Sequence, residues 1–364
     1  MNSFKKCLVF THTAVPNYGA NLQALATNLL LRESGYEPTY LSIIPGEVEK
    51  HYSRSVNENQ RSIHTSFVKK NIILTETFNS KTEVEEYVSK SNYELLVTGS
   101  DAVFKLDNSS EIWDLNYPNP FWLDAFLGDK ISISASAMGS DIWKCIEKTN
   151  RDRFTRNLSN FKTLTVRDSW TARQLSKFGL NPKVTLDPVF FLPHLNKSYD
   201  YREYLDEKYV VTSIPKYFSS EWKLNLKDEL NSLGYEAVEI GTPESSNSYL
   251  DPYEWYSLIA KSAGFIGMRF HPIVVSLANG VPVFALDQYA RTPWHRAPSK
   301  TYQLLEQFNL SKNHCTKLGY RFIKPRDIVK KLFSQDEKTL KLVNKIVAKQ
   351  ISYFREELKN CVQK

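Results

Sequence analysis

The sequence predicts an α/β protein made of two doubly wound, Rossmann-like domains that face a cleft. Short apolar runs alternate with amphipathic helical patterns, which is typical of βαβ units around parallel sheets. The length of 364 residues suits about two domains, and 41% hydrophobic with 24% charged residues is a globular composition. We predict a first domain at 1–195, a second at 206–335, and a C-terminal helix at 336–364 that can cross back to the first.

The first predicted domain begins with a clear βαβ unit. An apolar run at 5–12 predicts a strand, and an amphipathic pattern at 20–35 predicts a helix that ends at Gly35, where a left-handed residue is expected. Residues 46–92 are polar and predict helices without clear bounds. Asp168 is the expected N-cap of a helix that stops at Gly179. Further strands are predicted within 37–43, 93–101, 130–141, 161–167 and 183–192.

The second predicted domain repeats the alternation of strands and helices. Its most informative stretch is "GFIGMRFHPIVVSLA", in which a short apolar strand ending at Met268 leads directly into an apolar helix. Strands are predicted at 208–215, 235–241, 264–268 and 281–287, and helices at 220–234, 251–263 and from 300 onward. Ligands of such sheets normally bind at the carboxyl ends of the strands, so chemistry is expected there.

Charge and cysteine usage exclude several classes of protein. The formal net charge is +7, yet the densest basic runs are two residues long, which argues against a nucleic-acid partner and suits a small anion or an anionic membrane surface equally well. The four cysteines lie far apart without metal-ligand spacing, so we expect no metal site and no disulfide framework. Without a signal peptide or an apolar span, the chain is expected to be cytoplasmic.

The corner at Arg269 and His271 is the first candidate site. Both residues follow the predicted strand at 264–268, and Pro272 suits the first turn of the next helix. A helix N-terminus carries partial positive charge and unpaired backbone donors, so a guanidinium and an imidazole there predict a pocket for phosphate or carboxylate. The alternative is that Arg269 pairs with a structural carboxylate and His271 caps the helix.

Other polar residues at strand ends and helix starts are weaker candidates. Arg167 ends a strand just before Asp168, where it could bind an anion or form a salt bridge, and Lys300 opens a helical pattern, where it could bind an anion or be a solvated lysine. The polar residues in turns at strand ends could contact a ligand or only form turns. His295, in a loop, could line the cleft or be an ordinary loop residue. These acceptor or cleft candidates are Asn17, Tyr18, Gly19, Asn21, Ser100, Asp101 and His295.

Six stretches of this chain, in order, resemble the polysaccharide pyruvyl transferase family. They are "NYGANLQALATNLLLRESGY", "LLVTGSDAVF", "ISISASAMGSD", "LTVRDSWTARQLSKFG", "LDPVFFL" and "FIGMRFHPIVVSLANGVPVFAL". The Arg-x-His corner and the Gly-Ser-Asp segment are the most specific. The chain departs from the family pattern at Pro272, where glycine is usual, and at Ala102 and Phe104, where the family commonly has Gln and Trp; we expect these two to lie near the cleft.

The resemblance implies a fold similar to the GT-B glycosyltransferases and an enzyme, a polysaccharide pyruvyltransferase. The donor would be phosphoenolpyruvate with no further cofactor, and the product a cyclic ketal on a polysaccharide or lipid-linked oligosaccharide, with possible peripheral contact with the inner membrane face. Donor binding is then expected of Arg167, Arg269, His271 and Lys300, and catalysis of Arg269 and His271. Two alternatives remain open: a GT-B glycosyltransferase that uses a nucleotide sugar, and a catalytically silent sugar-binding subunit.

Overall fold

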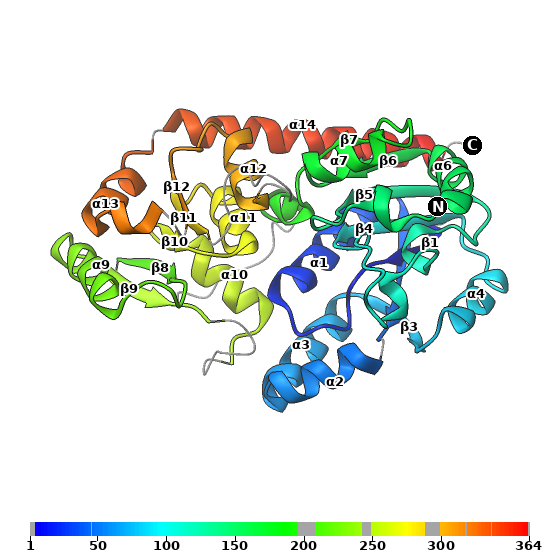
Figure 1. Cartoon of the computed structure of the whole chain (residues 1–364), viewed down its shortest axis with the longest axis horizontal. Coiled ribbons are helices and arrows are strands. Elements are labelled where there is room, and N and C mark those ends of the chain that lie inside the picture. The colour runs from blue at the N-terminus through cyan, green and yellow to red at the C-terminus, as the bar shows by residue number, and fades with distance from the viewer. Residues whose placement is uncertain are drawn as a thin grey trace. The chain divides into compact units, whose positions relative to one another are not determined.

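The computed structural model describes residues 4–44, 46–195, 208–241, 249–287, 299–316, 319–335 and 337–362. The chain divides into two compact units, Met1–Pro188 with Lys349–Lys364, and Val189–Ala348. Each unit is built on one parallel sheet with helices packed against it (Figure 1). The predicted α/β class with two Rossmann-like sheets is therefore confirmed.

The sheet of the first unit has seven strands in the order β3-β2-β1-β4-β5-β6-β7. All of its neighbouring strands pair in parallel. The order reverses between β1 and β4, so the carboxyl ends of these two strands form the switch point at which ligands of such sheets bind. The strands are β1 (Lys5–Phe10), β2 (Tyr36–Ile43), β3 (Ile73–Phe78), β4 (Leu95–Asp101), β5 (Asp129–Ala135), β6 (Thr163–Val166) and β7 (Lys183–Val184).

The helix after β1 is the best buried of the first unit, because it packs against β2, β4 and α3. Its start is capped by Asn17, and it ends before Gly35, whose φ of 90° is the left-handed conformation expected there. Within 46–92 the helices were expected, but β3 was not. The helices are α1 (Tyr18–Glu33), α2 (Gly46–Ser55), α3 (Glu58–Asn71), α4 (Lys81–Ser89), α5 (Ile142–Cys145), α6 (Arg151–Ser159) and α7 (Ser169–Ser176).

An aromatic cluster lies in the core of the first unit. Phe104 is fully buried and stacks on Trp122 with ring centroids 4.2 Å apart, and Trp122 in turn contacts Phe154. The ring of Phe104 is therefore part of the core, and a position of this residue near the cleft stays a prediction. A planar apolar ring three residues after β4 gains more from burial against Trp122 than from exposure to solvent.

The sheet of the second unit has five strands in the order β12-β11-β10-β8-β9, which reverses between β8 and β10. Its neighbouring strands also pair in parallel. The strands are β8 (Tyr209–Ser213), β9 (Glu236–Glu239), β10 (Phe265–Gly267), β11 (Val283–Asp287) and β12 (His314–Thr316). The helices are α8 (Leu192–Leu195), α9 (Ser220–Ser232), α10 (Pro252–Ala260), α11 (Phe270–Ala278), α12 (Lys300–Gln307), α13 (Pro325–Phe333) and α14 (Glu337–Val362). Five 3-10 turns complete the described elements: η1 (Trp113–Leu115), η2 (Pro120–Trp122), η3 (Lys148–Asn150), η4 (Pro188–Phe191) and η5 (Gly319–Phe322).

Both faces of this second sheet are buried, which explains its continuous apolar strands. Ile266 and Phe284 pack into a cluster with residues of α9 and α13. The residues next to them, Phe265 and Val283, point to the opposite face and are also fully buried. A parallel sheet covered on both faces has this pattern rather than an alternating one.

The long helix α14 belongs to both units, because its residues from Lys349 onward cluster with the first. Gln350 accepts a hydrogen bond from the backbone of Leu186 at 2.6 Å, and the Leu358 carbonyl accepts one from the hydroxyl of Tyr36 at 3.2 Å. In the described part of the chain, no helix is both long enough and apolar enough to cross a bilayer.

Candidate functional site

The Arg269 corner lies at the switch point of the second sheet. β10 ends at Gly267, Arg269 is the N-cap of α11, and His271 is the second residue of that helix. Ligand-binding residues are expected here because β8 and β10 separate the two halves of the strand order. The predicted position of both residues, at a strand's carboxyl end and a helix start, is confirmed.

The backbone at Arg269 has a conformation that is unusual for a residue with a side chain. Its φ is 113° and its ψ is 139°, near a region that essentially only glycine occupies. Holding a non-glycine residue there costs on the order of 1–3 kcal/mol, and such outliers cluster at functional sites. The side chain of Arg269 is exposed, and that of His271 is half-buried.

The neighbouring strand approaches this corner very closely. A Cβ on Gly267 would meet the backbone oxygen of Ser213 at 2.6 Å and its nitrogen at 2.8 Å, so only glycine fits there. The backbone N–H of Met268 donates to the same Ser213 oxygen at 2.9 Å. These contacts fix the end of β10 against β8 and set the place at which α11 begins.

Lys300 lies beside the same corner. Ser299 caps α12 and donates its hydroxyl to Asp287 at the end of β11, which fixes where α12 starts. The ammonium of Lys300 lies 5.2 Å from the ring centroid of Phe270, the residue between Arg269 and His271. The structure thus brings three predicted donor residues together around the start of one helix.

Sequence reasoning missed two polar residues next to Lys300. Asp287 is buried at the end of β11, and its carboxylate lies 3.3 Å from Nε2 of His314 at the start of β12. The strand pairing places these elements side by side. An aspartate that ends an otherwise apolar strand was the available signal, whereas nothing in the sequence identified His314 as its partner.

Arg167 lies in the first unit, directly after β6, and its side chain is only 4% exposed. Its guanidinium donates to Asp187 at 3.0 Å and lies 3.9 Å from Asp101. Burial alone would lower the pKa of Arg167, but the carboxylates of Asp187 and Asp101 outweigh it and raise that pKa, so the group stays charged. The structure therefore includes the salt bridge that the alternative interpretation of Arg167 described.

Ser100 and Asp101 lie at the switch point of the first sheet. Ser100 is buried, donates to the Ser134 carbonyl at 2.9 Å, and accepts a weak hydrogen bond from Gln23 at 3.4 Å. Gln23 also donates to Asp187 at 2.5 Å, so this network includes two residues that we did not predict as site residues. Asp101 is a partly exposed, non-glycine residue with a φ of 75°.

The residues around the start of α1 have mainly packing partners. The exposed Asn17 accepts from the Ala20 N–H at 3.1 Å as a helix cap. Tyr18 and Asn21 are buried against α3; the Tyr18 hydroxyl accepts from Gln60 at 2.9 Å.

In the same contact with α3, Asn21 Oδ1 lies 2.5 Å from His64 Nδ1. Gly19 is buried beside Tyr18. A role of these residues toward an acceptor stays a prediction, and His295 lies outside the described residues.

No group of three or more His, Cys, Asp or Glu side chains in the described part of the chain could hold a metal ion. The described cysteines are not cross-linked; Cys7, Cys315 and Cys361 are buried, and Cys145 is partly exposed.

Comparison with known proteins defines the class. The model of the polysaccharide pyruvyl transferase family matches residues 17–288, so the chain belongs to this family of transferases. The matched range includes Arg167, Arg269 and His271 and ends before Lys300. Among curated protein sequences, no significant match is found.

Solved structures show the fold. UGT73P12 of Glycyrrhiza uralensis, complexed with glycyrrhetinic acid 3-O-monoglucuronide, is 8% identical with a TM-score of 0.52, covering 98% of this chain and 96% of its own. LpCGTa in complex with UDP is 10% identical with a TM-score of 0.52, covering 99% and 98%. The glycosyltransferase SnogD of Streptomyces nogalater is 10% identical with a TM-score of 0.46, covering 100% and 98%. The two structures with TM-scores of 0.52 show that the chain has the GT-B fold.

Proposed function

We propose that this chain transfers the pyruvyl group of phosphoenolpyruvate to two hydroxyls of one sugar, forming a cyclic ketal and releasing phosphate. The observation that supports this best is the group of Arg269, His271 and Lys300 around the start of α11. A small donor with a phosphate and a carboxylate needs several cations and backbone donors, and this corner offers both.

The proposed reaction has three steps. A proton adds to the methylene carbon of the donor, and the first sugar hydroxyl forms a bond to the neighbouring carbon while losing its proton. The bond between that carbon and the phosphate oxygen then breaks, and phosphate leaves. The second hydroxyl attacks the same carbon and closes the ketal. The two hydroxyl protons are matched by one proton on the new methyl group and one on the released phosphate.

In this proposal Arg269 and the N-terminus of α11 stabilise the charge of the leaving phosphate. His271 binds the phosphate or donates the first proton, because an imidazole can donate a hydrogen bond to an anion or act as a general acid. Lys300 neutralises the second anionic group of the donor. We favour donor binding as the role of both His271 and Lys300, because the anionic groups must be neutralised in every step, whereas a proton is donated in only some.

The first unit is the proposed acceptor side, and the second the donor side. Arg167 is the exception among the proposed donor residues, because its charge is engaged by Asp187 and Asp101. Asp101 is partly exposed at the first switch point, and we propose that its side chain contacts the acceptor.

Titration with ligands while thermal unfolding is followed tests the function. Phosphoenolpyruvate should stabilise the protein by roughly 2.7 kcal/mol at a hundredfold excess over its Kd. Stabilisation by UDP instead would favour the alternative of a nucleotide-sugar glycosyltransferase, in line with the UDP complex of LpCGTa. Stabilisation by glycans alone would favour a catalytically silent sugar-binding subunit.

The proposed acceptor is a lipid-linked or free oligosaccharide, and we propose a cytoplasmic location with peripheral contact with the inner membrane face. The net charge of +7 supports this contact, because anionic lipids attract basic proteins. The contact should weaken as salt is raised. A protein that accepts only free sugars and ignores anionic vesicles at low salt would contradict it.

A further inference from the structure

The positive charge of this protein is concentrated in one segment. Residues 312–345 contain ten Lys and Arg against three Asp and Glu, an excess of seven that equals the formal net charge of +7 of the whole chain. The rest of the chain is therefore balanced. The basic residues of this segment are spaced along it, and no run of consecutive basic residues exceeds two.

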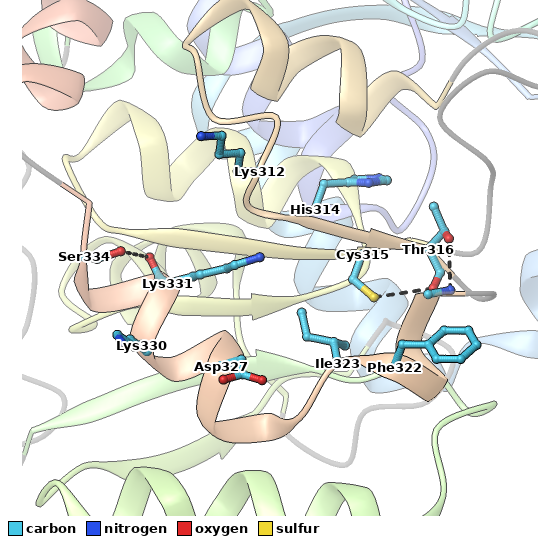
Figure 2. A pocket seen from close by; sticks show the side chains of 11 residues that line it. Lys312, His314, Cys315, Thr316, Phe322, Ile323, Asp327, Lys330, Lys331 and Ser334 are labelled. Carbon is cyan, nitrogen blue, oxygen red and sulfur yellow. Dashed lines mark hydrogen bonds between the residues drawn. The ribbon is translucent and has the colours of Figure 1, made fainter.

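Residues between 312 and 334 of this segment line a groove. A pocket of about 940 Å³ lies along the edge strand β12 and beside α13; its charged lining residues are Lys312, Lys330, Lys331 and one carboxylate, Asp327 (Figure 2). All three lysines are exposed. Lys330 and Lys331 form the last turn of α13.

An aromatic side chain stands at the same groove. Phe322, in the turn η5 that leads to α13, lines the pocket and is 88% exposed (Figure 2). Exposing a phenylalanine to water forgoes the free energy of its burial, about 1.5–3 kcal/mol, unless a partner covers it. Lysines and an exposed aromatic ring on one surface are a combination found at the interface of a bilayer, where the ring enters the headgroup region.

A peptide strand is the other occupant that an edge strand suggests, and the geometry argues against it. β12 has three residues, and short edge strands offer too few backbone groups to guide the addition of a further strand. The lysines and the exposed Phe322 ring can bind a partner without backbone hydrogen bonds to a further strand. A lipid surface therefore fits this face better than an extended peptide.

We infer that the groove between β12 and α13, with Phe322 at its rim, docks the protein on an anionic lipid surface. Phosphate headgroups contact Lys312, Lys330 and Lys331, and the Phe322 ring inserts among the headgroups. This inference rests on the membrane contact proposed above and not on the transfer reaction.

A matched pair of double variants tests the assignment. Lys330→Gln/Lys331→Gln removes two charges from the groove, and Lys69→Gln/Lys70→Gln removes two exposed lysines from the last turn of α3. Both variants lower the net charge equally. Each lysine near an anionic surface contributes roughly fivefold to partitioning, so the groove variant should bind vesicles of phosphatidylcholine with phosphatidylglycerol roughly 25-fold more weakly, and the α3 variant nearly as well as wild type.

Phe322→Ser should reduce the same binding several-fold, because it removes the inserting ring and leaves every charge in place. Vesicle flotation at low salt measures binding, and thermal unfolding confirms that each variant is folded. Stabilisation by phosphoenolpyruvate should be unchanged in all of them, which separates this surface from the donor site.

Three outcomes would overturn the inference. Equal losses in both lysine pairs would mean that net charge alone attracts the protein to vesicles. Tighter binding of soluble polyphosphate than of vesicles, lost in Lys330→Gln/Lys331→Gln, would mean that the groove takes a soluble polyanion. Wild-type protein that ignores anionic vesicles would refute the membrane contact too, whereas the proposed transfer would fail only if phosphoenolpyruvate did not bind.

Discussion

Arg167 and Arg269 occupy the same kind of position in the two units, yet their surroundings are opposite. Each follows a parallel strand directly and precedes a helix. Arg167 is 4% exposed and holds the fully buried Asp187, whereas Arg269 is exposed and serves as the N-cap of α11. The same local pattern thus produces a buried ion pair in one unit and an exposed cation in the other.

The backbones of the two corners differ as well. α7 has a conventional cap, because Asp168 accepts from the Thr171 N–H at 2.7 Å. At α11 the cap position is Arg269 in a conformation suited to glycine. The corner at Arg167 is thus capped and ion-paired, whereas the corner at Arg269 has a strained backbone and an exposed cation. Such a difference is expected if the first corner is structural and the second binds a ligand.

The largest expected effect is on stability, from Arg167→Ala. Removing one partner of a buried ion pair leaves Asp187 charged and buried, which typically costs about 3–5 kcal/mol of the free energy of unfolding. Chemical denaturation should show this loss. Asp187→Asn in the same background should restore part of it, because it removes the unpaired charge. A fully stable Arg167→Ala protein would contradict the structural interpretation of this corner.

The next effect is on activity, from Arg269→Ala. The bound donor would desolvate the guanidinium of Arg269, and truncating one partner of such a charge pair typically costs about 2–5 kcal/mol, which is at least a tenfold loss in kcat/KM for pyruvyl transfer. The fold should stay intact, because the side chain is exposed. Near-normal turnover would refute the assignment, and an unfolded variant would favour a structural role.

Arg269→Gly sharpens the same comparison, because glycine adopts the observed φ of 113° without strain. This variant should be at least as stable as Arg269→Ala, while both lose activity. Thermal unfolding of the two purified variants provides the comparison. A glycine variant clearly less stable than the alanine variant would mean that the backbone at this corner is not strained.

His271→Ala and Lys300→Ala should each weaken the binding of phosphoenolpyruvate, and Lys300→Arg should retain most of it. Residues that share one ligand are coupled, so the double variant should lose less than the sum of the single losses. Calorimetric titration measures the affinities. Unchanged donor affinity in both single variants would overturn donor binding.

Steady-state kinetics distinguishes proton donation by His271 from donor binding. If it donates the first proton, His271→Gln should lower kcat with little change in donor affinity and remove one limb of the pH–rate profile.

The smallest expected effect is at the cap of α7. Asp168→Ala removes the bond to the Thr171 N–H and should cost about 1 kcal/mol of unfolding free energy, while Asp168→Asn should cost less because Asn also caps helices. Denaturant titration of both variants checks this. Equal losses would show that charge near Arg167, and not capping, is what Asp168 contributes.

The sequence by itself determined the alternation of strands and helices, and most of their positions. The starts of α7 at Asp168 and of α12 at Lys300 were predicted, because caps and periodicity act over a few residues. The same local reasoning located the Arg269 corner. It missed β3, in which only Phe78 is buried and polar residues interrupt the apolar ones, so that no apolar run marks the strand.

Only the tertiary structure decided which corner is buried. Asp187 and Gln23 are 164 positions apart, and they meet at Arg167 because the sheet order brings their elements to one edge. Lys300 reaches Phe270 for the same kind of reason, through the pairing of β10 with β11. Whether an arginine after a strand is buried in an ion pair or exposed depends on carboxylates from distant segments of the chain. The local sequence pattern does not determine which of those carboxylates lie beside it in the fold.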